Sequence, residues 1–184
     1  MNSADHFEAI VQEHSESLFR FAMSLTRSES DAKDLTQHTF YVWATHGHQL
    51  RDLSKVKTWL FTTLHRAFLA AQRKRTRFIF EPLEEVADEL PAFTPLPGRG
   101  LDGSRILAAL ERVDQRFQAA VALFYLEDYS YQQIAVVLEV PVGTVKSRIS
   151  RGIAQLREIF ESTEPFELES SGPSRAHLLH DCGS

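Results

Sequence analysis

The 184-residue sequence is poor in the residues and patterns that would assign it to catalysis or to a membrane. It has one cysteine, Cys182, which excludes an internal disulfide framework and favours a reducing compartment. No apolar run approaches the roughly 20 residues of a membrane span. The start MNSADHFEAI lacks the basic-then-apolar pattern of a signal peptide. We therefore expect a cytoplasmic protein with no membrane insertion.

Catalytic motifs are also missing. There is no phosphate-cradling glycine loop, no H-E-x-x-H helix and no nucleophile motif. His46 and His48 lie close together but have no third candidate ligand nearby, whereas a metal site needs three or four. The tail run HLLHDC brings together His177, His180 and Cys182, and whether it binds metal or regulates stays open. We expect no enzymatic activity, no cofactor, no metal and no small-molecule substrate.

The net charge of −5 argues against a nucleic-acid-binding protein only when the chain is taken as a whole. Residues 1–80 hold 11 lysines and arginines against 8 acids, and residues 105–160 hold 7 against 6. The acidic excess lies in residues 81–104, with 1 against 6, and in residues 161–184, with 1 against 5. Two mildly basic domains are therefore predicted, with an acidic linker and an acidic tail.

Proline and glycine locate the linker. Residues 81–104 contain four of the seven prolines and three of the eight glycines. This composition is typical of a flexible connection between domains. Residues 161–184 are rich in glutamate and serine, and we expect most of them to be disordered.

Helical periodicity of apolar residues accounts for both domains, so the predicted fold is all-α. In the first domain it predicts a helix near residues 4–26, a second helix that begins near Glu29 within the stretch 28–47, a loop at 44–54 and a third helix over 54–77. Residues 104–126 add a further helix or two, which complete the core of the second domain.

Residues 130–160 are the most informative stretch. Ser130 and Gln133 have the spacing of a capping box, and Pro141 ends the helix that they start. A second helix is predicted to begin near residues 143–144. One side of it is apolar: Val145, Ile149, Gly152, Ile153, Leu156 and Phe160. The other side is polar and cationic, and no acid occurs before Glu158.

Two short helices with a cationic second helix are typical of a helix-turn-helix that reads the major groove of DNA. Arginine pairs with guanine, and serine and lysine reach phosphates or base edges. An ordinary helical hairpin with a solvated basic face has the same spacing, so the pattern alone leaves both interpretations open.

The run LEDYSYQQIAVVLEVPVGTVKSRISRGIAQLRE resembles region four of bacterial RNA polymerase sigma factors, most closely the extracytoplasmic-function (ECF) group of the sigma-70 family. The segment PVGTVKSRISRG is its most specific part. The resemblance implies contacts to the −35 promoter element from Thr144, Lys146, Ser147, Arg148, Ser150 and Arg151. Glu139 stands where the family often has glycine, which suits a left-handed helix cap.

The run DAKDLTQHTFYVWA resembles the D-A-E-D-L-V-Q-E-T-F run of sigma region two, with His38 in place of an acid. Asp34, Gln37, His38 and Tyr41 form an outward polar ridge on this helix, which without the resemblance would be interpreted as a solvated helix face. The resemblance implies docking on the clamp helices of the polymerase β′ subunit by Asp31, Asp34, Leu35, Gln37 and Phe40.

Cations gather after this helix. Between residues 51 and 77 there are eight lysines and arginines against one acid. This is more positive charge than the helix dipole requires, and it favours phosphate binding. The eight are Arg51, Lys55, Lys57, Arg66, Arg73, Lys74, Arg75 and Arg77. The resemblance implies that this region contacts the −10 element and that the loop at 44–54 holds a flipped-out base.

The expected function is that of a promoter-specificity subunit. Its expected partners are promoter DNA and core RNA polymerase, through the β′ clamp helices and the β flap. An anti-sigma factor is a further candidate partner. A stand-alone helix-turn-helix regulator is the alternative, which would leave residues 1–80 without a role. An enzyme with a helical regulatory domain is a further alternative, which a measured turnover would be needed to support.

Overall fold

The structure is a computed structural model that describes residues 3–75 and 103–163. In these two ranges the regular elements are helices, and no strand occurs. The first range forms α1 (Ser3–Thr26), α2 (Glu29–His46), the short 3-10 turns η1 (Gly47–Gln49) and η2 (Leu53–Lys55), and α3 (Val56–Arg75). The second forms α4 (Gly103–Leu110), α5 (Gln115–Leu126), α6 (Tyr131–Leu138) and α7 (Val142–Thr163). The all-α prediction is confirmed.

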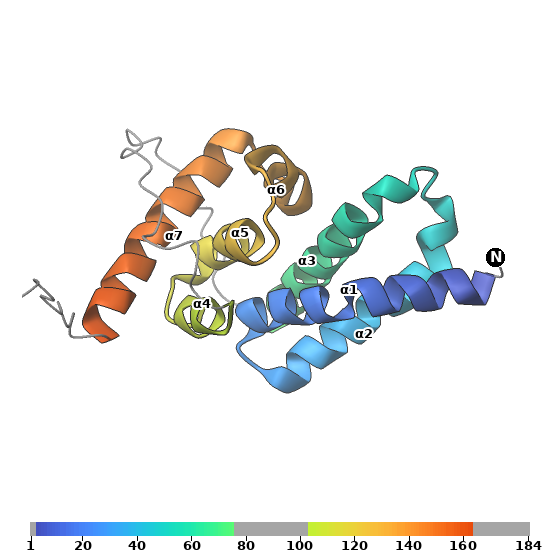
Figure 1. Cartoon of the computed structure of the whole chain (residues 1–184), viewed down its shortest axis with the longest axis horizontal. Coiled ribbons are helices and arrows are strands. Elements are labelled where there is room, and N and C mark those ends of the chain that lie inside the picture. The colour runs from blue at the N-terminus through green and yellow to red at the C-terminus, as the bar shows by residue number, and fades with distance from the viewer. Residues whose placement is uncertain (1–2, 76–102, 164–184) are drawn as a thin grey trace, which may run out of the picture.

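Helices α1 to α3 form the first unit (Figure 1). Its core contains two aromatic pairs. The ring centroids of Phe21 and Phe61 are 5.3 Å apart, and those of Trp43 and Trp59, which pack edge to face, are 5.2 Å apart. The backbone turns directly against Trp43 at Gly47, where a Cβ atom would lie 2.6 Å from the ring. Only glycine fits this position, so α2 and the loop after it are held closely together.

Helices α4 to α7 form the second unit. The predicted apolar side of its last helix is confirmed, since Val145, Ile149, Ile153 and Leu156 are 0–3% exposed. Helix α7 packs on α5, which carries a run of seven consecutive buried residues from Phe117 to Leu123. A helix that is buried on all sides needs neighbours on all sides. Helices α4, α6 and α7 cover part of its surface, and α1 of the first unit covers the rest.

The turn between α6 and α7 follows the sequence closely. Ser130 and Gln133 form the predicted capping box, each side chain accepting a hydrogen bond from the other's backbone N–H. Helix α6 ends at Glu139, whose φ of 57° and ψ of 42° are left-handed. This conformation costs a residue other than glycine free energy, so the glutamate at this position needs an explanation.

The two units pack against each other, α1 on α5 and α4, and α3 on α6 (Figure 1). One polar contact between them is a hydrogen bond of 2.9 Å from Nη2 of Arg27 to the carbonyl oxygen of Val113. Helix α4 begins at Gly103, so its first two residues lie within the predicted linker. The rest of the linker, most of the tail, Arg77 and the three tail residues His177, His180 and Cys182 lie outside the described residues.

Candidate nucleic-acid interface

The predicted DNA-reading residues all lie in the first half of α7. Lys146 is exposed, and the other five are partly buried: Thr144, Ser147, Arg148, Ser150 and Arg151. The hydroxyl of Ser147 donates a hydrogen bond of 3.0 Å to the carbonyl oxygen of Thr144, within the helix. Buried Val145 and Ile149 anchor the opposite side. The packing therefore fixes the orientation of this helix, and Lys146 is its most accessible cation.

Arg148 lies near a buried histidine of the first unit. His65, on α3, is 8% exposed. The pKa of His65 is lowered to about 4, mainly by burial and also by the positive charge of Arg148, while Glu139 acts in the opposite direction. Helices α7 and α3 are thus close enough for Arg148 and His65 to interact electrostatically. The sequence placed these residues in separate domains and gave no sign of this proximity.

We expect the folded state to lose stability as the pH falls below 6.5. The folded state binds the proton of His65 more weakly than the unfolded chain, so stability is complete above pH 6.5 and is lost towards pH 4. Between pH 7.5 and 5.0 the loss from this residue is roughly 2 kcal/mol. Urea unfolding at the two pH values measures it.

The matched variant for this measurement is His65→Gln, which cannot titrate. Burial also lowers the pKa of His14, so some pH dependence will remain in the variant. The difference between the two proteins isolates His65. Equal losses in both would contradict the assignment.

The candidate −10 cations differ in their surroundings. Arg51, Arg73 and Lys74 are exposed, and Lys55 lies 3.5 Å from Asp52. Three others are engaged with carboxylates: Lys57 with Glu127 at 3.0 Å, Arg66 with Glu139 at 2.6 Å and Arg75 with Asp31 at 3.1 Å. Two of these three acids belong to the second unit, so part of the predicted DNA surface is covered by the packing between units.

Glu127 is a residue that the sequence analysis did not single out. It lies between α5 and α6 with its side chain only 3% exposed, between Lys57 and Arg20, whose Nη2 is 3.6 Å away. The Lys57 ammonium also lies 5.0 Å from the ring centroid of Tyr129. Burial raises the pKa of the Tyr129 hydroxyl. The available signal was the pair of acids, Glu127 and Asp128, beside the apolar residues of the run FYLEDY, since a buried carboxylate requires a cationic partner.

The predicted docking residues lie on α2. Asp34 and Gln37 are exposed, Asp31 and Leu35 are half-buried, and Tyr41 is 67% exposed. The fifth predicted residue, Phe40, is only 9% exposed and belongs to the core. Its ring therefore supports the ridge from within and is not presented on it.

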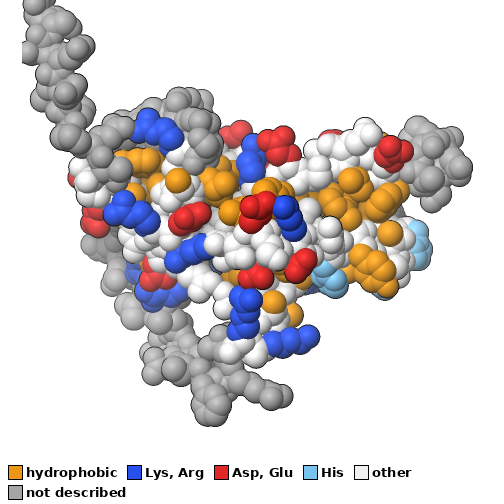
Figure 2. Space-filling model, turned by 90° about the horizontal axis from the view of Figure 1, so that it is seen from below, with side chains coloured by type: hydrophobic (Ala, Val, Ile, Leu, Met, Phe, Trp, Pro, Cys, Tyr) orange, Lys and Arg blue, Asp and Glu red, His pale blue; other side chains and the backbone are white. Residues whose placement is uncertain are grey.

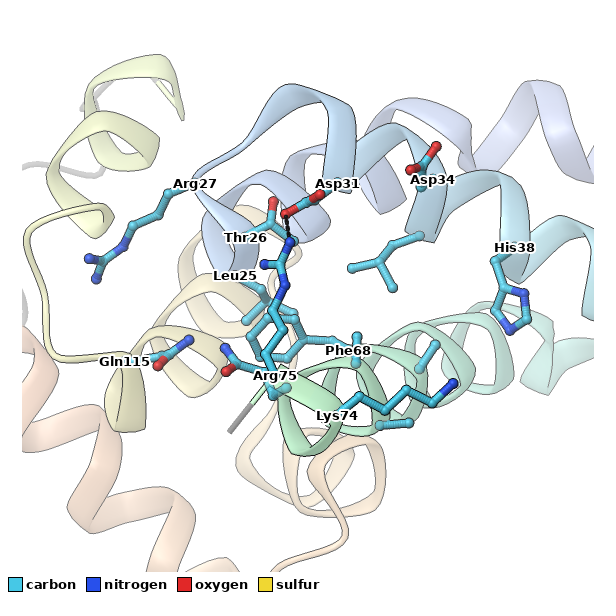
Figure 3. Close-up of a pocket in the computed structure, with 15 residues that line it drawn as sticks. Leu25, Thr26, Arg27, Asp31, Asp34, His38, Phe68, Lys74, Arg75 and Gln115 are labelled. Atoms are coloured by element: carbon cyan, nitrogen blue, oxygen red, sulfur yellow. Dashed lines mark ion pairs between the residues drawn. The ribbon is translucent and has the colours of Figure 1, made fainter. Parts of the chain in front are cut away.

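A hollow of about 510 Å³ lies beside this ridge, between α2 and α3 (Figure 3). The ion pair between Arg75 and Asp31 crosses it, Phe68 lies at its base, and Lys74 and Asp34 stand on opposite sides. Its lining combines apolar side chains with two acids, Asp31 and Asp34, and with the cations Arg27, Lys74 and Arg75. Figure 2 shows acids and cations interspersed across one face, with hydrophobic side chains between them and histidines towards one end.

Among residues 3–75 and 103–163, no group of three or more potential metal ligands comes together. In the same part of the chain, no helix combines the length and hydropathy that crossing a membrane requires.

Two known families match this chain, and each match corresponds to one of the two helical units. Residues 10–78 match the family described as Sigma-70 region 2, and residues 104–156 match Sigma-70, region 4. The chain is 31% identical over 140 residues to the ECF RNA polymerase sigma factor EcfG of Rhodopseudomonas palustris, covering 76% of this chain and 77% of that one. It is 36% identical over 156 residues to SigE of Mycolicibacterium smegmatis, covering 83% of this chain and 60% of that relative.

A solved structure has the same helical arrangement. The sigma factor RpoE of Bartonella quintana, in complex with the anti-sigma factor NepR, matches with a TM-score of 0.66 at 26% sequence identity. The match covers 86% of this chain and 99% of that one.

Proposed function

The chain belongs to the ECF group of the sigma-70 family, and on this basis we propose that it directs core RNA polymerase to specific promoters and so initiates transcription. The observation that carries the proposal is the presence of both family regions, in order, in one chain. A stand-alone regulator would account for the helix-turn-helix but not for the region 2 match, so that alternative is not favoured. The protein would catalyse no reaction of its own.

The roles of the two units follow from their surfaces. The first half of α7 would read the −35 element, with Lys146, Arg148 and Arg151 as its charged contacts. The cations of α3 and the preceding loop would hold the −10 element through its phosphates. The exposed ridge of α2 would dock on the β′ clamp helices, and the second unit on the β flap. An anti-sigma factor is a further proposed partner, because the Bartonella relative was solved with one.

Reconstituted transcription tests the function directly. Purified chain and core polymerase are combined with genomic fragments, and the 5′ ends of run-off transcripts are sequenced. We expect a set of start sites that depends on the chain and shares sequence elements near −35 and −10. Failure to bind core polymerase, or transcripts identical to those of core enzyme alone, would refute the proposal.

Reversing charge on the α2 ridge should weaken docking. Asp34→Arg combined with Gln37→Ala changes two exposed side chains and leaves the core intact. Like charges placed across an interface cost several kcal/mol, so we expect binding to core polymerase to fall by at least tenfold. A pull-down titration with core enzyme measures the effect.

Glu161→Arg is the control for this change, because it introduces the same charge at an exposed position near the end of α7. It should bind core polymerase as the unaltered chain does. If both proteins bind equally well, or both lose binding equally, α2 is not the docking surface.

A further inference from the structure

The packing between the two units has a consistent charge pattern. Three ion pairs between them each place an acid of the second unit against a cation of the first. Glu139 meets Arg66, and Glu127 meets Lys57 and Arg20. Lys57 and Arg66 are also two of the cations assigned above to promoter DNA. Carboxylates therefore occupy the place where phosphates would bind.

The geometry of the Glu139 pair is that of a two-point contact. Nε of Arg66 donates to one carboxylate oxygen at 3.0 Å, and Nη2 donates to the other at 2.6 Å. This paired arrangement is the strongest that arginine makes with a carboxylate. It raises the pKa of Arg66 and lowers that of Glu139, mainly through the hydrogen bonds between the two side chains.

The pair also explains the unusual backbone of Glu139. Its residue type is costly in the left-handed conformation, in which glycine would be unstrained. Glycine, however, has no carboxylate to offer to Arg66. The glutamate side chain thus does not stabilise the turn itself, and its contribution is the ion pair with Arg66 of the other unit.

We propose that Glu139 and Glu127, with Arg66, Lys57 and Arg20, form a clasp that holds the chain closed and shields part of its own DNA-binding surface until a partner opens it. The inference rests on the proposed function. In that function the two units read elements more than one turn of B-DNA apart, and one turn is about 34–36 Å. The closed packing keeps Arg148 beside His65 of α3, so both elements cannot be read in this arrangement.

Single-molecule energy transfer on the free, full-length chain tests the clasp without polymerase. Dyes are placed on cysteines at Ala44 and Ala154, two exposed positions, one in each unit, with Cys182→Ser. We expect Glu139→Gln to raise the open-to-closed ratio about two- to fivefold, the range of an exposed ion pair. Glu127→Gln should raise it on the order of tenfold, since its partners lose a buried carboxylate.

Two further variants identify the cause. Exchange of the charges in the double variant Arg66→Glu with Glu139→Arg should restore the closed population, because the pair is re-formed in reverse. Glu158→Gln, which removes one exposed acid from α7, should leave the ratio unchanged. Circular dichroism confirms that each variant is folded, and if Glu127→Gln is not, Glu139→Gln and the charge exchange decide.

Salt gives an independent readout. Raising NaCl from 0.05 to 0.5 M should open the unaltered chain, because the Glu139 pair is exposed and screened. Glu139→Gln should show a smaller change. A ratio for Glu139→Gln equal to that of the unaltered chain, or a charge exchange that fails to restore closure, would overturn the clasp. Neither result would affect the transcription assay. Failure of the transcription assay would leave the measured open-to-closed ratios as they are but would remove the shielding of a DNA-binding surface, so the two failures are distinguishable.

Discussion

Gly152→Ala is expected to destabilise the second unit by about 1–3 kcal/mol, the usual cost of adding a methyl group to a filled core. An ideal Cβ at this position would lie 2.3 Å from Cγ2 of Val121 and 3.1 Å from Cβ of Phe117. Val121 is 0% exposed and β-branched, so its side chain has little freedom to move away. Chemical denaturation followed by circular dichroism measures the loss. DNA binding should fall with it, because this contact positions the reading helix.

Gly143→Ala is the matched control. It lies in the same helix, yet nothing lies within 4 Å of the Cβ that it would gain. Alanine should stabilise the helix there by up to about 1 kcal/mol. The double variant Gly152→Ala with Val121→Ala should lose less than the sum of its parts, because the second change removes the clash. Equal effects of alanine at positions 143 and 152 would contradict the packing described.

Arg148→Ala combined with Arg151→Ala is expected to abolish selective transcription, lowering it by at least tenfold. Each arginine that contacts a base contributes about 1–3 kcal/mol of discrimination. Neither position belongs to the buried stripe of α7, so folding should be retained. Run-off transcription from a promoter found in the reconstitution, compared with the same promoter altered near −35, gives the discrimination ratio.

Arg157→Ala is the control, since it removes the same charge from a later turn of the same helix. It should leave the ratio unchanged. The Arg148 change carries a second readout, because its charge is one cause of the lowered pKa of His65. That pKa should rise in the variant. Unaltered discrimination in the double variant would remove α7 from the role of reading helix.

The helices were predictable because their signals are local. Capping at Ser130 and Gln133, the stripe from Val145 to Leu156 and the break at Pro141 each depend on neighbours a few residues away. The left-handed end of α6 was foreseen as a departure from glycine at Glu139. The boundaries also agree closely, with α7 beginning at Val142 against an expectation of 143–144.

The packing between units was not predictable by the same means. Its contacts join residues far apart in sequence, as in Arg66 with Glu139, and charge alone does not say which acid meets which base. Glu127 illustrates the limit, since its burial depends on α1 and α3 arriving from the other unit. Phe40 differs in another way, because the resemblance implies a docking role at the surface for a side chain that is buried in the core.

The burial of α5 on all sides limits how readily residues 103–163 can be replaced by the corresponding segment of a related protein. Its seven consecutive buried residues contact both its own unit and α1. A chimera that received residues 103–163 from a relative would place a foreign α5 against the resident α1. Even if the transplanted segment folded well, its α5 would not be complementary in shape to the resident α1. The two family regions are therefore separate in sequence but share packing in the structure. A chimera that retains stability would have to take a compatible α1 from the same relative as α5.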